Sequence, residues 1–242
     1  ALPILSPEQA KGKETDRRTD VWAFGCVLFE MLTGRAAFEG ETVGEILGGI
    51  FKAEPDWKSL PAETPAGIRR LLRRCLQKNQ TRRLHDMADA RIEIEEAQAE
   101  PEPSPGVPAA AFRTRERMAW GMAAVFLAHE IALDRKVAIK VMSPQFVHGA
   151  DMIERFKREA RTAAGLNHPH IIPIYAVRES QQVLYFVMKY IQGRSVDAIL
   201  RDVGPLPFPM VRSILGDIGS ALDYAHRQGV VHRDVKPGNI MI

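Results

Sequence analysis

The chain has 242 residues, of which 45% are hydrophobic and 26% are charged, and its formal net charge is +3. This length allows one large domain or two small ones, and the composition is typical of a soluble globular protein. The weak net charge and the interspersed acidic and basic residues argue against nucleic acid as a partner.

The first 97 residues have a helical pattern. Asp20 is a candidate N-cap for a helix whose apolar stripe ends at Gly34. A second helix is expected over 68–76, and a last one over about 86–98. The polar face of the second helix has four arginines: Arg69, Arg70, Arg73 and Arg74. We interpret this face as a solvated helix surface, with an anion-binding patch as the alternative.

Both cysteines of the chain, Cys26 and Cys75, lie within these apolar helical patterns. This placement predicts buried free thiols rather than a disulfide or a metal site, and it fits a reducing, cytoplasmic location. The chain begins with Ala rather than Met, which we interpret as the start of a fragment or of a processed product.

A proline-rich stretch then divides the chain. Residues 101–108 contain four prolines, a density that excludes a helix and favours an extended linker, which we place at 98–117. The apolar run over 118–128 follows a basic flank and resembles the start of a membrane anchor. Its length of about eleven residues is too short to span a bilayer, which needs roughly twenty. We expect a buried strand there, and membrane anchoring only in a longer parent protein.

Strands come first after the linker. Apolar segments bounded by polar turns predict four strands, followed by a long amphipathic helix. An acidic variant of a capping box, Asp151 with Glu154, predicts a helix between the second and third strands. The first two strands flank a turn at 133–136 and should form a hairpin. The strands are expected at 125–128, 137–142, 171–177 and 183–190, and the helices at 151–164 and about 211–225.

The residues with the clearest chemistry lie near the C-terminus, where His232 to Asn239 have the pattern H-R-D-x-K-x-x-N. Phosphoryl transfer requires a protein to hold a nucleotide, bind metal, neutralise charge and orient the acceptor hydroxyl. The pattern resembles the catalytic loop of protein kinases, and this resemblance implies that Asp234 accepts or orients the hydroxyl proton and that Lys236 neutralises the transferring phosphate. Asn239 would hold a metal ion, whereas His232 is interpreted as structural.

A second motif is Val137-Ala138-Ile139-Lys140. Strand alternation points Ala138 and Lys140 to the same face, where the small Ala leaves room for adenine and Lys140 can reach phosphates. A surface lysine at the end of an apolar strand is the ordinary alternative. Glu159 on the following helix can face inward and pair with Lys140; its alternative is a surface glutamate.

These motifs resemble those of bacterial Hanks-type serine/threonine protein kinases, in which both V-A-I-K and the H-R-D loop occur. Ser6-Pro7-Glu8 resembles the A-P-E motif of that family, and Arg83 falls where the family places the partner of Glu8. Asp20 falls where an aspartate braces the catalytic loop. The resemblance implies an α+β, kinase-like bilobal fold with an antiparallel-sheet lobe and a mainly helical lobe. It also implies ATP and Mg²⁺ as cofactors and Ser or Thr hydroxyls of proteins as substrates.

The same resemblance implies an adenine site. Val125 corresponds to the valine after the glycine-rich loop, and Met188 to the gatekeeper. The hinge backbone at Lys189, Tyr190 and Ile191 would hydrogen-bond adenine, and Met241 would lie under its ring. Apolar residues at such positions also serve as ordinary core residues.

The sequence departs from the family in its order. Residues 1–97 resemble the end of the large lobe, yet they precede 118–242, which resemble the small lobe, the hinge and the catalytic loop. The glycine-rich loop is degraded, and no Asp-Phe-Gly occurs. The linker is long enough to reconnect the halves, because about twenty extended residues reach roughly 60 Å. We therefore expect a circularly permuted or incomplete kinase with feeble or no turnover; the alternative is a pseudokinase-like nucleotide-binding or scaffold module.

Overall fold

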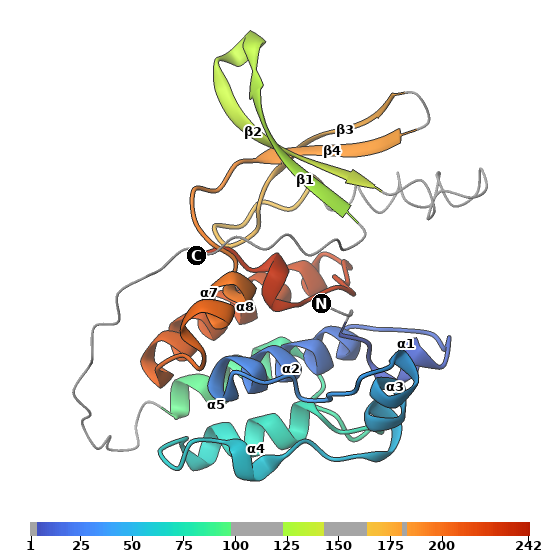
Figure 1. The fold of residues 1–242 in the computed structure, drawn as a ribbon, viewed down its shortest axis with the longest axis vertical. Coiled ribbons are helices and arrows are strands. Elements are labelled where there is room, and N and C mark those ends of the chain that lie inside the picture. The colour runs from blue at the N-terminus through green and yellow to red at the C-terminus, as the bar shows by residue number, and fades with distance from the viewer. Residues whose placement is uncertain (1–3, 98–122, 143–163, 181–182) are drawn as a thin grey trace. The chain divides into compact units, whose positions relative to one another are not determined.

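The computed structural model describes residues 4–97, 123–142, 164–180 and 183–242. They fall into two compact units, each shown in Figure 1. The described residues of the sheet unit come from one continuous stretch of the sequence, 123–193. The described residues of the helical unit are 4–97 and 194–242. The helical unit is therefore built from two segments that are distant in the sequence.

The helical unit contains the helices expected from apolar periodicity, together with several that the periodicity did not indicate. Its first segment forms α1 (Pro7–Ala10), α2 (Arg18–Thr33), α3 (Val43–Lys52), a short 3₁₀ turn η1 (Trp57–Ser59), α4 (Ala66–Cys75) and α5 (Met87–Glu96). Its second segment forms α7 (Val196–Val203), α8 (Phe208–Arg227) and the 3₁₀ turn η4 (Pro237–Asn239).

The end of α2 follows the expected rule, since Gly34 adopts a left-handed conformation with φ of 70° and its amide caps the helix. Asp86 caps α5 by accepting from Asp89 N. The helices predicted over 68–76 and 86–98 are thus confirmed within two residues at each end.

Helix α2 lies at the centre of the core and packs against α4 and α8. At Gly25 the approach of α4 is so close that a Cβ atom would lie 2.6 Å from Cys75 Cβ. Both Cys26 and Cys75 are buried and free, as predicted. Burial raises the pKa of both thiols, that of Cys75 to about 12. These thiols are therefore protonated and behave as small apolar core groups.

The two segments of the helical unit share one hydrophobic core, which includes Leu71 from the first segment and Leu215 from the second. Helices α5 and α8 pack together (Figure 1), and Arg91 Nη1 of α5 lies 3.6 Å from Asp223 Oδ2 of α8. The amide of Leu206 donates to the carbonyl of Met31 at 2.8 Å. Burial and hydrogen bonding thus join segments that the sequence separates.

The sheet unit has four described strands, all antiparallel to their neighbours, in the order β1-β2-β4-β3. The predicted hairpin is confirmed, although its turn lies earlier than expected. A 3₁₀ turn and Asp134, with φ of 46°, make the connection, so residues 135 and 136 already belong to the second strand. The strands are β1 (Ala123–Glu130), β2 (Arg135–Met142), β3 (Ile174–Ser180) and β4 (Val183–Lys189).

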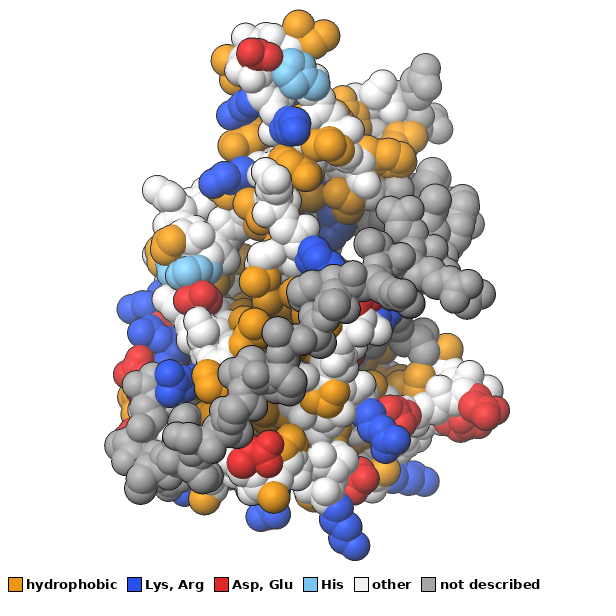
Figure 2. Space-filling model, turned by 60° about the vertical axis from the view of Figure 1, so that its left-hand side comes forward, with side chains coloured by type: hydrophobic (Ala, Val, Ile, Leu, Met, Phe, Trp, Pro, Cys, Tyr) orange, Lys and Arg blue, Asp and Glu red, His pale blue; other side chains and the backbone are white. Residues whose placement is uncertain are grey.

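The strand expected in the apolar run is present as β1, but the expectation that it is buried is wrong. Val125, Phe126 and Leu127 are 58%, 55% and 59% exposed. The reason is that β1, among the strands that the structure describes, lies at the edge of the sheet and pairs with β2 alone. Hydrophobic side chains are visible over the β1–β2 hairpin at the top of Figure 2.

Other expectations fall outside the described residues. These are the linker at 98–117 and, apart from its last residue, the helix at 151–164. Among the helices that the structure describes, none is both long enough and apolar enough to cross a membrane.

Candidate active site

The C-terminal loop brings three predicted side chains together around the carboxylate of Asp234. Lys236 Nζ donates to Asp234 Oδ1 at 2.9 Å, and Asn239 Nδ2 donates to Oδ2 at 3.0 Å. Asn239 Nδ2 also donates to the carbonyl of Asp234 at 2.7 Å. The side chain of Asp234 is 45% exposed, so the carboxylate is both oriented and reachable from solvent. Such a group can bind a hydroxyl and take its proton, with a cation beside it.

Asp20 of α2 binds the backbone of this loop. The amides of His232 and Arg233 donate to its carboxylate at 2.8 and 2.7 Å. His226 Nε2 of α8 lies 2.8 Å from the same carboxylate, and the side chains of Asp20 and His226 are 0% and 3% exposed. Charge-assisted hydrogen bonds in such a buried place are strong, because water does not compete for them. The first segment therefore fixes the loop of the second.

The predicted N-cap role of Asp20 is wrong. Helix α2 begins at Arg18, which places Asp20 inside its first turn. Asp16 Oδ1 instead accepts from the amide of Arg18 at 2.9 Å, at the start of the helix. The oxygens of Asp20 are taken by the amides of the loop and by His226. A carboxylate turned toward those donors is not available to the amides of its own helix.

Arg233 has a φ of 64°, in the left-handed region that residues other than glycine rarely adopt. Such a conformation costs on the order of 1 kcal/mol and persists only where neighbours determine it. Its amide is held by Asp20, and its carbonyl accepts from Gln9 Nε2 at 3.1 Å. The peptide that leads into Asp234 is therefore held on both sides by the first segment of the chain.

A buried ion pair supports the segment that contains Gln9. Arg83 donates to both oxygens of Glu8, at 2.6 and 2.9 Å, and the two side chains are 0% and 5% exposed. The pairing of Glu8 with Arg83 is thus confirmed. Burial raises the pKa of Glu8, but hydrogen bonds and positive charge from Arg83 outweigh it, so the pKa lies below its usual value. Ser6 and Gln9 close a capping box over α1.

The sheet unit places a second group of predicted residues on one face. Directly opposed residues on antiparallel strands point to the same side, and so do alternate residues along one strand. Val125 is opposite Lys140, and Ala138 is opposite Met188. Ala138 is 9% exposed and Val125 is 58% exposed. The result is an apolar surface beside a lysine, which fits a flat ring and an attached anion.

The other residues predicted to contact adenine are the hinge residues after β4 and Met241 near the C-terminus. Strand β4 ends at Lys189, whose amide donates to the carbonyl of Pro173 at 3.0 Å, and Tyr190 and Ile191 follow outside any strand. Met241 pairs with Ser195 in an isolated bridge and is 37% exposed. Met241 therefore lies beside the start of α7 in the helical unit.

Glu159, the predicted partner of Lys140, lies outside the described residues. The Asp234 group belongs to the helical unit and the Lys140 group to the sheet unit.

The fit of a magnesium ion can be tested on Asn239. The Nδ2 of Asn239 donates both of its hydrogen bonds to Asp234. The side-chain carbonyl oxygen of Asn239 is a hard ligand of the kind that Mg²⁺ prefers. Within the described ranges, no group of three or more His, Cys, Asp or Glu residues could hold a metal. Asn239 thus fits a metal that takes most of its ligands from phosphate and water.

Two residues of the site had no assigned role from the sequence. His226 and Gln9 contact the loop assembly through partners 206 and 224 positions away. No local spacing indicates such pairs. The only signal was the placement of Asp20 by resemblance, which predicted that the loop is braced but not by which other groups.

Comparisons with known proteins cover both segments. Residues 3–95 and 121–242 match the family model described as protein kinase domain. Over 122 residues the chain is 42% identical to serine/threonine-protein kinase PrkC of Bacillus subtilis, covering 50% of this chain and 19% of that protein. Over 126 residues it is 40% identical to serine/threonine-protein kinase PknB of Mycobacterium leprae, covering 50% of this chain and 20% of that protein.

The chain thus spans about a fifth of the length of these curated relatives. Among solved structures, the PknI kinase domain of Mycobacterium tuberculosis is 34% identical with a TM-score of 0.46. That alignment covers 51% of this chain and 50% of the other.

Proposed function

The chain belongs to the protein kinase domain family, and we propose that its Asp234 loop serves the transfer of the γ-phosphate of ATP to Ser or Thr hydroxyls of proteins. The observation that carries the proposal is the carboxylate of Asp234, held between Lys236 and Asn239 on a backbone that Asp20 braces. The matched relatives are named serine/threonine-protein kinases, which supports this class of acceptor.

In the proposed reaction, Asp234 accepts a hydrogen bond from the acceptor hydroxyl and takes its proton as the new oxygen–phosphorus bond forms. The bond from that phosphorus to the β-phosphate oxygen breaks, and ADP leaves. Lys236, 2.9 Å from Asp234, offsets the negative charge on the transferring group. The hydrogen bond between the two side chains supports these roles, because it orients both groups and so limits the reorganisation that the reaction needs.

We assign nucleotide binding to the face of the sheet that contains Lys140. Val125, Ala138 and Met188 would contact adenine, and Lys140 would contact phosphate, with Glu159 as its proposed partner. The backbone from Lys189 to Ile191 would hydrogen-bond the edge of the adenine ring, and Met241 would lie against it. The common face of the four sheet residues supports this assignment.

Asn239 is the residue of this chain that would hold Mg²⁺, through its carbonyl oxygen. When bound, the ion neutralises phosphate charge and helps to align the transferring group. The chain's own part is to keep the amide turned by the two hydrogen bonds from its Nδ2 to Asp234.

A second candidate is a nucleotide-binding module with little turnover. The sequence favours it in one respect, because none of its 242 residues forms an Asp-Phe-Gly motif, the usual source of a second metal ligand. We therefore expect this polypeptide to bind ATP and to transfer phosphate slowly. We also place the protein in a reducing cytoplasm, which its two buried free thiols support.

The test combines a binding and a turnover measurement. ATP with Mg²⁺ should raise the melting temperature of the wild type and of Asp234→Asn alike, whereas Lys140→Met should weaken this effect. Incorporation of radiolabelled phosphate into a generic protein substrate should be low in the wild type and absent in Asp234→Asn. No ATP-dependent shift would contradict the nucleotide site, and turnover that survives Asp234→Asn would contradict the role of Asp234. Robust turnover that Asp234→Asn abolishes would support transfer and select it over the second candidate.

A further inference from the structure

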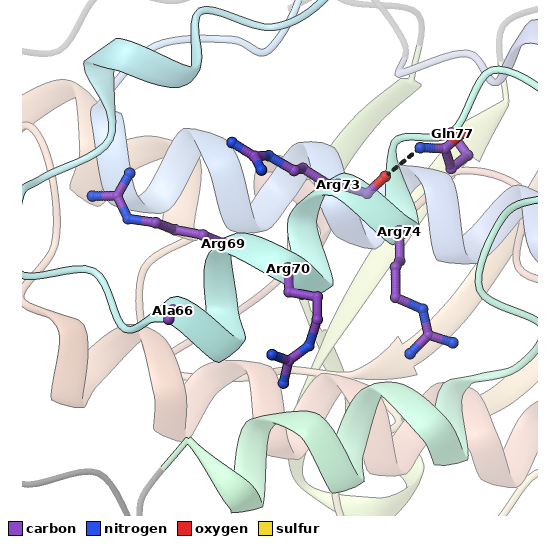
Figure 3. Close-up of a pocket in the computed structure, with 6 residues that line it drawn as sticks. All are labelled: Ala66, Arg69, Arg70, Arg73, Arg74 and Gln77. Atoms are coloured by element: carbon purple, nitrogen blue, oxygen red, sulfur yellow. Dashed lines mark hydrogen bonds between the residues drawn. The ribbon is translucent and has the colours of Figure 1, made fainter.

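The outer face of α4 carries a basic hollow that the proposed reaction does not use. It has a volume of about 440 Å³ and is seen in close-up in Figure 3. Arg70 and Arg74 extend toward α5, and Arg69 and Arg73 extend along the other flank. The hollow is lined by these four arginines, with Ala66 at one end and Gln77 at the other.

The four arginines differ in the bonds that their guanidinium groups already make. Arg69 donates to the carbonyls of Pro61 and Thr64, and its side chain is therefore fixed. Arg74 pairs with Glu93 of α5 while remaining 48% exposed. The guanidinium groups of these two arginines are therefore already bonded within the protein.

The other two arginines are exposed. Arg73 lies over the ring of Trp57, with its Cζ 5.9 Å from the centroid, which is a contact with the ring rather than with a hydrogen-bond acceptor. No hydrogen bond or ion pair joins the guanidinium of Arg70 to another described residue. Arg70 and Arg73 are thus the pair that can bind a ligand without breaking an existing bond.

We infer that this arginine face docks an extended acidic peptide segment of a protein partner, with Glu or Asp at alternate positions. The spacing supports this ligand. Residues four apart on a helix are separated by about 6 Å along its axis, and alternate residues of an extended chain by about 6.6 Å. Each of the two rows, Arg69 with Arg73 and Arg70 with Arg74, therefore matches the spacing of successive carboxylates on one side of a strand, and each row contains one arginine of the pair Arg70 and Arg73. The Arg74–Glu93 pair is an intramolecular example of the same contact.

The surroundings favour a peptide over nucleic acid. Single-stranded nucleic acid is usually bound by aromatic side chains that stack on its bases, and the lining of this hollow contains none. Duplex DNA needs a basic surface that extends along its backbone. Helix α5 beside the hollow contributes Glu93, Glu95 and Glu96 instead. Acidic residues on that side limit the basic surface to about the length of α4, which suits a short segment.

The experiment uses the full chain and a fluorescein-labelled ten-residue peptide that alternates Glu with Gly, followed by fluorescence anisotropy at low salt. A peptide with Gln in place of Glu is the ligand control. We expect the Glu peptide to bind and the Gln peptide not to bind. Raising the salt from about 50 to 200 mM should weaken binding several-fold, because the contacts are between exposed charges.

The matched variants are Arg70→Ala/Arg73→Ala and Arg82→Ala, which removes an exposed arginine outside the hollow. The double variant should weaken binding about tenfold, and Arg82→Ala by less than about twofold. Arg70→Gln alone should weaken binding about threefold, and it tests the proposal if the double variant fails to fold. Circular dichroism checks the fold of each variant.

Several outcomes would overturn the inference. They are equal binding of the Gln peptide, binding unchanged in the double variant, and tighter binding of a duplex DNA oligonucleotide than of the Glu peptide. A phosphoserine peptide that binds more than about tenfold tighter than the Glu peptide would replace the carboxylate ligand by a phosphoryl one. None of these measurements involves ATP or Asp234, so this inference and the proposed reaction can fail separately.

Discussion

The two units of this protein are stabilised in different ways. The helical unit gathers a large core from both ends of the sequence, and several buried polar groups lie within it. In the sheet unit, the buried apolar residues among those described are Val137, Ala138 and Leu184. The described strands of the sheet come from one continuous stretch of the sequence, whereas the contacts within the helical unit do not depend on the order of its two segments. Chain order mainly changes the cost of closing loops, and that cost grows slowly with loop length.

The polar interactions show the same contrast. In the helical unit the Glu8–Arg83 pair and the Asp20 carboxylate are buried. In the sheet unit the pair His129–Asp134 is exposed to solvent, and the pair Arg135–Glu130 is about one-third exposed. Exposed pairs contribute about 0–1 kcal/mol, whereas breaking a buried pair costs several. Substitutions should therefore have their largest effects in the helical unit.

The largest effect is expected for Arg83→Ala. The substitution leaves the carboxylate of Glu8 buried without its partner, which should cost about 3–5 kcal/mol of the free energy of unfolding. Urea unfolding followed by far-ultraviolet circular dichroism measures this loss, because the helical unit supplies most of the signal. The exposed Arg82→Ala is the control and should change the free energy by less than about 0.5 kcal/mol. A loss below about 1 kcal/mol for Arg83→Ala would contradict the buried pair.

The same substitution placed in each unit tests the contrast in burial. Leu71→Ala removes a side chain that is 0% exposed in the core between α2 and α4, and it should cost about 2–5 kcal/mol. Leu127→Ala removes the same atoms from edge strand β1, where the leucine is 59% exposed, and it should cost less than about 0.5 kcal/mol. Urea unfolding of both variants provides the comparison. Similar losses would show that the edge strand is covered in solution.

Asp20→Ala should have the next largest effect, because Asp20 connects the two segments of the helical unit. The substitution leaves the amides of His232 and Arg233 and the ring of His226 without their buried acceptor. We expect a loss of about 2–3 kcal/mol, since each unsatisfied donor costs on the order of 1 kcal/mol. Hydrogen exchange of the two loop amides should speed up more than that of amides in α4. Unchanged protection of those amides would contradict the bracing role.

The sequence predicted the helical unit well where periodicity was strong. Helices α2, α4 and α8 have long apolar stripes, and their existence and approximate bounds follow from them. Helix α3 was missed, because three of its ten residues are glycines, which weaken a helical pattern even though Thr42 caps it. Helix α7 was missed although Val196, Ile199, Leu200 and Val203 recur at helical spacing and Ser195 caps it, so the signal was present in the sequence.

The residues of the candidate site likewise fall into those that a local pattern predicted and those that it did not. Asp234, Lys236 and Asn239 lie within six residues of one loop, so their spacing was enough to predict that they act together. The roles of His226 and Gln9 depend on how distant segments pack, which no local pattern encodes. The same limit explains the error at Asp20, since an aspartate near a helix start suits an N-cap as well as a buried acceptor.

Lowering the pH should have a smaller effect on the stability of the fold. Because the pKa of Glu8 lies below its usual value in the folded protein, its ion pair stabilises the fold above the unfolded pKa of about 4.3. This stabilisation is lost as the pH falls through the lower folded pKa. Urea midpoints between pH 7 and pH 3 should therefore fall below about pH 4, and Glu8→Gln should be less stable at pH 7 but flatter over that range. Parallel curves for the two proteins would mean that Glu8 does not contribute to the acid response.

The smallest effect should come from cutting the chain between its two segments. A protease recognition sequence can replace residues 103–108 of the proline-rich stretch, so that one specific cleavage separates the first segment from the rest. The shared core, the Met31–Leu206 hydrogen bond and the bonds to Asp20 all survive the cut. What is lost is the effective concentration that the connection supplies, on the order of millimolar.

At about ten micromolar we therefore expect the two pieces to elute together from a size-exclusion column with unchanged circular dichroism. The same cut in the Asp20→Ala background should release them at lower protein concentration, because the loop is no longer held. Pieces that separate without denaturant in the wild-type background would show that the order of the segments, and not their packing alone, maintains the helical unit.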